Sequence, residues 1–208
     1  MTIDRRRMLS LIVAAGAALT AAARPATAVE PKEAERFVAN IADELTQLVR
    51  SDLGPREQAE RFREIFVRDA ALEQIERFVM GVAWRDMSEA QKTRFRDAFL
   101  DYVANTYTDL LLDYEGQTLD VRDSRDFGDK GVLVFAKVSG DGPVSEWLVS
   151  DRGGDGPKLV DITAEGVSLL RTQRQEFAAM LEKRNGDIDD FISDLAEASG
   201  APKASSSG

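Results

Sequence analysis

Residues 158–177 read KLVDITAEGVSLLRTQRQEF, and this stretch connects the two kinds of structure that the chain is expected to form. Apolar and polar side chains alternate over residues 158–163, which predicts a β-strand. Gly166 permits a tight turn after this strand, and Ser168 is a favourable N-cap for a helix. The chain is therefore expected to pass here from the last strand of a sheet directly into a helix.

The segment before this stretch has the pattern of a β-sheet. Between residues 117 and 163 the hydrophobic pattern has a period near two, and three glycine-rich turn signals divide it. The pattern predicts a four-stranded antiparallel meander. The expected strands cover residues 117–124, 131–139, 144–151 and 157–163.

Helical spacing of apolar residues dominates on both sides of the expected sheet. Ser88 and Gln91 form a capping box that opens the longest helix. The expected helices cover residues 31–50, 56–66, 69–80, 89–113, 168–184 and 187–198. Helices followed by strands and again by helices predict one α+β domain over residues 29–198, and the small polar residues 199–208 predict a disordered tail.

Residues 1–28 have the pattern of an export signal rather than of folded structure. The arginines at 5–7 form a basic start, residues 8–23 are apolar, and Ala26-Thr27-Ala28 gives a small-x-small cleavage pattern. We expect cleavage after Ala28. The paired arginines also resemble a twin-arginine signal, so the sequence is compatible with both Tat and Sec export.

The composition excludes several classes of function. The chain has no cysteine and no histidine, so it lacks thiol chemistry and the commonest general base and metal ligand. We expect no catalytic residues and no metal site. Without residues 1–28, which hold four arginines and one aspartate, 23 basic and 36 acidic residues remain, a net charge of −13. This charge argues against nucleic acid as a partner and fits charge-steered docking on another protein.

Two blocks of the sequence resemble the MlaC-type (toluene-tolerance) family. Residues 158–177 are similar to the family pattern W-K-V-Y-D-V-x-I-E-G-V-S-L-V-x-x-Y-R-x-Q-F, and a helical segment of the family is similar to Val79-Met80-Gly81, Trp84-Arg85, Gln91, Phe95, Phe99 and Tyr107. The chain departs from the pattern at Met80, Pro157 and Gln173, where leucine, tryptophan and an aromatic residue are usual.

The resemblance implies a periplasmic lipid carrier. It implies helices packed on one face of a curved four-stranded antiparallel sheet, with an apolar cavity between the layers for the acyl chains of a phospholipid. The phospholipid is cargo, and no cofactor is implied. The implied partners are an inner-membrane ABC transporter complex with an Mce-domain subunit and an outer-membrane lipoprotein complex. A monomer is the simplest form for a carrier that moves between them.

The expected lipid contacts are apolar residues of the helices and of the inner sheet face. From the residues alone, such positions are more typical of an ordinary core than of a ligand pocket. The resemblance implies that the same residues form both the core and the cavity wall. The expected lipid-binding residues are Val79, Phe95, Phe99, Tyr102, Val103, Tyr107, Leu110, Val134, Val138, Trp147, Val149, Val167, Leu170 and Phe177.

The polar residues of the two blocks have structural as well as functional interpretations. Glu165, Gly166 and Ser168 are expected to form the turn and the helix cap, with contact to a lipid headgroup as the alternative. Arg174 is expected to anchor this turn or a carboxylate such as Asp161 rather than to bind phosphate. The pair Trp84-Arg85 is expected to fix a corner between two helices.

Three other functions remain compatible with the sequence. A hopanoid-type polycyclic lipid could replace phospholipid as the cargo of the same fold. A small-molecule enzyme would require a buried carboxylate paired with a tyrosine inside the cavity. An adaptor protein would have a filled core and no cavity.

Overall fold

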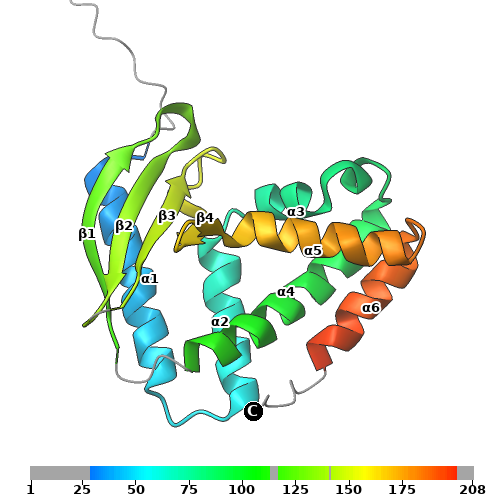
Figure 1. Cartoon of the computed structure of the whole chain (residues 1–208), viewed down its shortest axis with the longest axis horizontal. Coiled ribbons are helices and arrows are strands. Elements are labelled where there is room, and N and C mark those ends of the chain that lie inside the picture. The colour runs from blue at the N-terminus through cyan, green and yellow to red at the C-terminus, as the bar shows by residue number, and fades with distance from the viewer. Residues whose placement is uncertain (1–28, 113–116, 141, 201–208) are drawn as a thin grey trace, which may run out of the picture.

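The computed structural model describes residues 29–112, 117–140 and 142–200 (Figure 1), with backbone alone at 109–112 and 200. The expected export signal and residues 201–208 of the expected tail lie outside the described residues. The helices are α1 (Pro31–Val49), α2 (Pro55–Asp69), α3 (Leu72–Met80), η1 (Gly81–Arg85), α4 (Glu89–Leu112), η2 (Gly128–Lys130), α5 (Leu169–Lys183) and α6 (Ile188–Gly200). The strands are β1 (Leu119–Asp126), β2 (Val132–Val138), β3 (Val144–Ser150), β4 (Lys158–Ala164) and β5 (Val167–Ser168).

Local sequence signals account for most helix starts. Proline occupies the beginning of both α1 and α2, where its missing N–H costs no helical hydrogen bond. The predicted capping box of α4 is confirmed: the Gln91 N–H donates to Ser88 Oγ at 3.2 Å, and the Ser88 N–H donates to Gln91 Oε1 at 3.0 Å. Ser168 also caps α5 as predicted, since its Oγ accepts the Arg171 N–H at 3.1 Å.

Helix α3 begins three residues later than the sequence predicts. The prediction placed its start at residue 69, but Ala70 is extended and forms an isolated parallel bridge with Leu159 of β4. The Ala71 N–H donates to the Leu159 carbonyl at 2.8 Å. The backbone between α2 and α3 therefore hydrogen-bonds to the sheet instead of continuing the helix. As a result, α2 ends before α3 begins.

The predicted α+β class is confirmed, but the antiparallel sheet has five strands rather than four, in the order β1-β2-β3-β4-β5. Glu165 and Gly166 both adopt positive φ angles, of 51° and 81°, as the two-residue turns of β-hairpins require. After this turn Val167 pairs with Ala164, and Ser168 pairs with Thr163. The sequence pattern missed this strand because it is only two residues long and leads directly into α5.

The described residues form two hydrophobic cores. One lies between α1 and the inner face of the sheet and includes Val38, Val134 and Trp147. The other lies among the helices and is built around Phe95, which is fully buried. Figure 1 shows α1 lying along the sheet, whereas α3, α4, α5 and α6 gather on the other side of the molecule. Only α1 therefore covers the sheet face as predicted, and the remaining helices form a second layer beside it.

Candidate functional site

A hollow of about 360 Å³ lies between these two layers. Its volume falls in the range of about 300–1,000 Å³ that is usual for small-molecule pockets. Helices α1 and α2 supply one wall, with Ile41, Ala42, Leu45, Val49, Phe62, Ile65 and Phe66. The opposite walls include Ile75 and Val79 of α3, Phe99, Val103 and Tyr107 of α4, Trp147 of β3, Leu159 and Ile162 of β4, and Leu169 and Leu170 of α5.

The exposure of the lining residues shows where this hollow opens. Of the described lining residues, only Arg50, Gln117 and Thr118 are exposed. Arg50 follows the last residue of α1, and the other two precede β1, so all three lie at the same end. Residues at the other end, such as Ile75 and Val79, are buried. The pocket therefore has an exposed, polar mouth at this end and a mainly apolar, less exposed interior.

The charged and polar side chains inside the pocket are largely satisfied by the protein. Asp69 pairs with Arg68, whose Nη2 lies 2.5 Å from Asp69 Oδ2. The Asp161 carboxylate accepts the Ser168 hydroxyl at 2.5 Å and the Leu170 N–H at 3.1 Å. These bonds fix the start of α5 against β4. Asp161 is thus a structural residue of the strand-to-helix corner.

Tyr107 is the pocket tyrosine, and its surroundings disfavour its charged form. Burial raises the pKa of the Tyr107 phenol to about 12, with smaller contributions from Tyr102, Glu176 and Asp161. Its hydroxyl makes no hydrogen bond with any residue that the structure describes. Asp161 also lines the pocket, but its oxygens are occupied by Ser168 and Leu170 rather than by Tyr107. The described residues that line the pocket therefore do not form the carboxylate–tyrosine pair that an enzyme would require, and the Tyr102 hydroxyl that donates to Glu176 at 3.4 Å belongs to a pair outside this lining.

A joint between α3 and α5 holds the helical wall in place. The Arg174 guanidinium donates to the Phe78 carbonyl at 2.9 Å and lies 5.0 Å from the centre of the Phe78 ring. Gly81 has a φ of +56°, and a Cβ atom there would lie 2.8 Å from Arg174 Nη2. Arg174 therefore anchors the end of α3. From the sequence, Asp161 was a possible partner of Arg174, but the structure does not form this pair. The Asp161 carboxylate is instead occupied by the Ser168 hydroxyl and the Leu170 N–H.

Trp84 fixes the next corner, between α3 and α4, as predicted. Its ring meets Phe95 edge-on at 6.4 Å, and Lys92 Nζ lies 5.2 Å from the ring centre. The two blocks of motif residues thus meet in space. Gly81, Trp84 and Arg174 position the helices and do not line the pocket.

Comparison with known proteins agrees with this geometry. The family described as MlaC protein matches residues 31–197. The chain belongs to the MlaC family. The intermembrane phospholipid transport system binding protein MlaC of Haemophilus influenzae is 21% identical over 131 residues. That alignment spans 60% of this chain and 60% of the relative's length.

A solved structure shows the same fold. The phospholipid-binding protein from Ralstonia solanacearum, determined in complex with a phospholipid, superposes with a TM-score of 0.68 at 22% sequence identity. The match covers 80% of this chain and 97% of the other. The α+β architecture of the described residues, with five strands and six α-helices, therefore shares the fold of that protein.

The structure brings seven of the expected lipid-binding residues of this MlaC-family chain to the pocket wall. They are Val79, Phe99, Val103, Tyr107, Val138, Trp147 and Leu170. They come from α3, α4, α5 and two strands, so residues far apart in the sequence converge on one surface.

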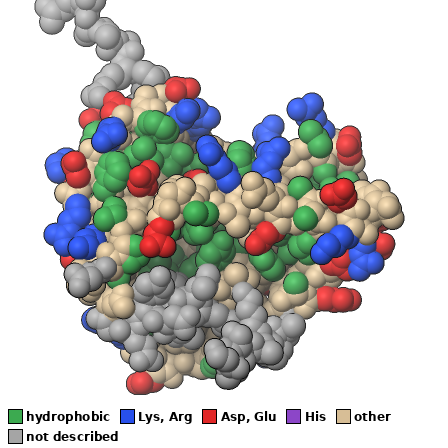
Figure 2. Space-filling model, in the orientation of Figure 1, with side chains coloured by type: hydrophobic (Ala, Val, Ile, Leu, Met, Phe, Trp, Pro, Cys, Tyr) green, Lys and Arg blue, Asp and Glu red, His purple; other side chains and the backbone are tan. Residues whose placement is uncertain are grey.

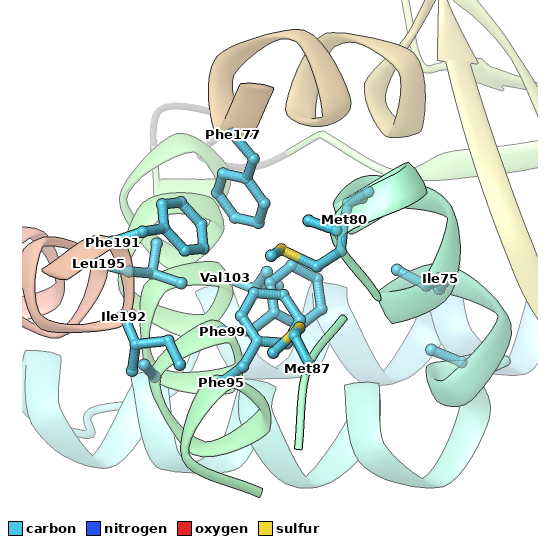
Figure 3. Close-up of a cluster of buried hydrophobic side chains, with 14 residues drawn as sticks. Ile75, Met80, Met87, Phe95, Phe99, Val103, Phe177, Phe191, Ile192 and Leu195 are labelled. Atoms are coloured by element: carbon cyan, nitrogen blue, oxygen red, sulfur yellow. The ribbon is translucent and has the colours of Figure 1, made fainter. Parts of the chain in front are cut away.

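Six other expected residues do not line the pocket. Phe95 and Phe177 pack against each other and against Phe191 in the helical core shown in Figure 3. Tyr102 packs edge-on against Phe177 at 5.8 Å, and Val134 and Val149 lie in the core under α1. Val167 is 55% exposed on β5. The side chain of Leu110 lies outside the described residues.

The sequence interpretation missed the wall supplied by α1 and α2. Ile41, Leu45, Phe62, Ile65 and Phe66 had been recognised only as apolar stripes of two helices. Those stripes do carry a signal, because a helix that faces a pocket has the same periodicity as one that faces a core. What the sequence could not provide was the orientation of these helices relative to the sheet.

Two negative findings complete the description of the site. The described residues contain no group of three or more Asp or Glu residues that could hold a metal ion. No helix within the described ranges is long and apolar enough to cross a membrane.

Proposed function

We propose that this protein binds a phospholipid by its acyl chains in the pocket between the layers and carries it between the inner and outer membranes. The observation that carries the proposal is the mainly apolar pocket with a polar mouth, in a chain of the MlaC family. Figure 2 shows hydrophobic side chains at the middle of one face, between the sheet and the helices, with charged side chains around them. A filled adaptor core would lack such a hollow.

The energetics favour reversible exchange with a membrane rather than irreversible capture from water. Burial of about 30 methylene groups at about 0.8 kcal/mol each would yield about 24 kcal/mol relative to water. This already exceeds the practical ceiling of about 18–21 kcal/mol for non-covalent affinity. Because a bilayer buries the same acyl chains, the net free energy of transfer between membrane and pocket is a small difference. A dry pocket can therefore load and unload lipid without catalysis.

The named relatives support the remaining parts of the proposal. One is the binding protein of an intermembrane phospholipid transport system, and another was determined with a phospholipid bound. The export-signal pattern of residues 1–28 supports a further proposal, that the protein acts in the periplasm after their removal. Its partners there would be an inner-membrane ABC transporter complex with an Mce-domain subunit and an outer-membrane lipoprotein complex.

A matched pair of overpacking variants tests whether the pocket is the lipid site. Ala42 is buried and lines the pocket, whereas Ala98 is buried in the helical core and does not. We expect Ala42→Phe to fill the hollow, to abolish uptake of fluorescent phosphatidylethanolamine from vesicles, and to leave the unfolding midpoint nearly unchanged. Ala98→Phe should take up lipid normally but lose about 1–3 kcal/mol of stability, because its new ring has no space. Normal lipid uptake by folded Ala42→Phe would refute the pocket as the site.

A further inference from the structure

Arg50 is the only lysine or arginine among the described residues that line the pocket. It directly follows α1, and its backbone N–H donates to the Thr46 carbonyl at 3.2 Å, which holds its Cα at the mouth. Its side chain is exposed, beside the similarly exposed Gln117 and Thr118 of the pocket lining. The position thus places a permanent positive charge where the apolar interior meets water.

The charge of Arg50 is not used by the described part of the protein. Its guanidinium forms no ion pair or hydrogen bond with a described residue. Arg68, near the same pocket, differs in this respect: its guanidinium is bound by Glu44 at 2.8 Å and by Asp69. The two acidic lining residues are likewise engaged elsewhere, Asp69 by Arg68 and Asp161 by Ser168. Within the described residues, the Arg50 guanidinium is therefore available to bind a ligand anion.

The chemistry of the mouth suits a phosphate. Acyl chains that enter the pocket would leave the polar end of the lipid at the mouth, where it remains hydrated. The carboxyl end of a helix carries a partial negative charge, so the end of α1 alone would repel a phosphate. A guanidinium reverses this preference and can bind phosphate oxygens with two parallel hydrogen bonds.

We infer that Arg50 binds the phosphate group of the lipid cargo and so selects phospholipids over uncharged lipids with the same acyl chains. This inference rests on the proposed function and adds to it the residue that binds the phosphate of the lipid. The phosphate is common to the phospholipid classes, so Arg50 would not distinguish one headgroup alcohol from another.

Paired lipids with identical chains test the inference. The mature protein is incubated with vesicles that contain dioleoylphosphatidylglycerol and dioleoylglycerol, and the bound masses are counted by native mass spectrometry. Because Arg50 is exposed, we expect Arg50→Gln to lower the ratio of bound phospholipid to bound diacylglycerol only about fivefold. Arg50→Lys should retain most of the preference. Arg85→Gln is the control, since it removes an exposed arginine that does not line the pocket.

Each other outcome contradicts the inference in a distinguishable way. An unchanged ratio of bound phospholipid to bound diacylglycerol in Arg50→Gln would show that the guanidinium does not bind the phosphate. An equal loss of both lipids would assign Arg50 to the shape of the mouth instead. If the unsubstituted protein bound neither lipid, the proposed function itself would fail together with the role of Arg50.

Discussion

Tyr107 is a buried phenol in an apolar wall, and its titration should affect stability at high pH. The pKa is about 12 in the folded protein and about 10 in an unfolded chain. The unfolded state therefore releases this proton first, so the stability contribution is complete below pH 10 and is lost as the pH rises towards 12. Between pH 9 and pH 12, the free energy of unfolding of the unsubstituted protein should fall by about 1–3 kcal/mol more than that of Tyr107→Phe. Urea unfolding at both pH values measures this difference.

The comparison of two proteins at each pH cancels the titration of other tyrosines and of lysines. The prediction would be wrong if both proteins lost stability equally over this interval. Such a result would mean that the Tyr107 hydroxyl reaches water in the folded state.

Gly81 combines a positive φ with a close neighbour, and this makes it the most constrained glycine of the helical wall. An added Cβ would meet the Arg174 guanidinium at 2.8 Å. Gly140 also has a positive φ, of +77°, but an added Cβ there would meet no atom within 4 Å. We expect Gly81→Ala to cost about 3 kcal/mol and Gly140→Ala about 1 kcal/mol in denaturant unfolding. Equal costs would show that the contact with Arg174 is unimportant.

At the scale of elements, the buried ion pair between α3 and α4 is an unusual feature. The Glu76 side chain is fully buried, and its carboxylate accepts two hydrogen bonds from Arg96, at 2.7 and 2.6 Å. Arg96→Met would leave a buried carboxylate without its cation. Because Arg96 itself is about half exposed, we expect a loss of about 2–4 kcal/mol, below the upper range for such pairs. Thermal or urea unfolding measures this loss.

The exposed pair between Arg184 and Asp194 provides the control. It has the same two-bond geometry, at 2.7 and 2.6 Å, but its carboxylate is 27% exposed, whereas that of Glu76 is fully buried. Arg184→Met should therefore change the unfolding midpoint little. The burial argument would be contradicted if the two variants were equally destabilised.

The elements themselves were largely predictable because their signals are local. Alternation, glycine-rich turns and the caps at Ser88 and Ser168 fixed the main strands and helices to within a few residues. The two main errors had different causes. Ala70 pairs with Leu159 of the sheet, far along the chain, which delays α3, and no local pattern contains that pairing. Strand β5 follows a local turn at Glu165-Gly166, but its two residues are too few to show alternation.

For the whole molecule, the sequence predicted the class of fold but not which apolar residues face the hollow. Phe95 and Phe99 belong to the same stripe of α4, yet only Phe99 reaches the pocket, whereas Phe95 stacks on Phe191. A core and a pocket wall have the same hydrophobic pattern, so periodicity cannot separate them. The separation depends on how the helical layer tilts away from α1 and the sheet.

Native mass spectrometry of the protein purified from its own host, followed by solvent extraction and fragmentation of the released mass, tests the central claim most directly. The account predicts one bound phospholipid per chain, which is lost in Ala42→Phe and retained in Ala98→Phe. A hopanoid mass would keep the pocket but replace the cargo. A protein without lipid, which also takes up none from phosphatidylethanolamine vesicles, would contradict the account.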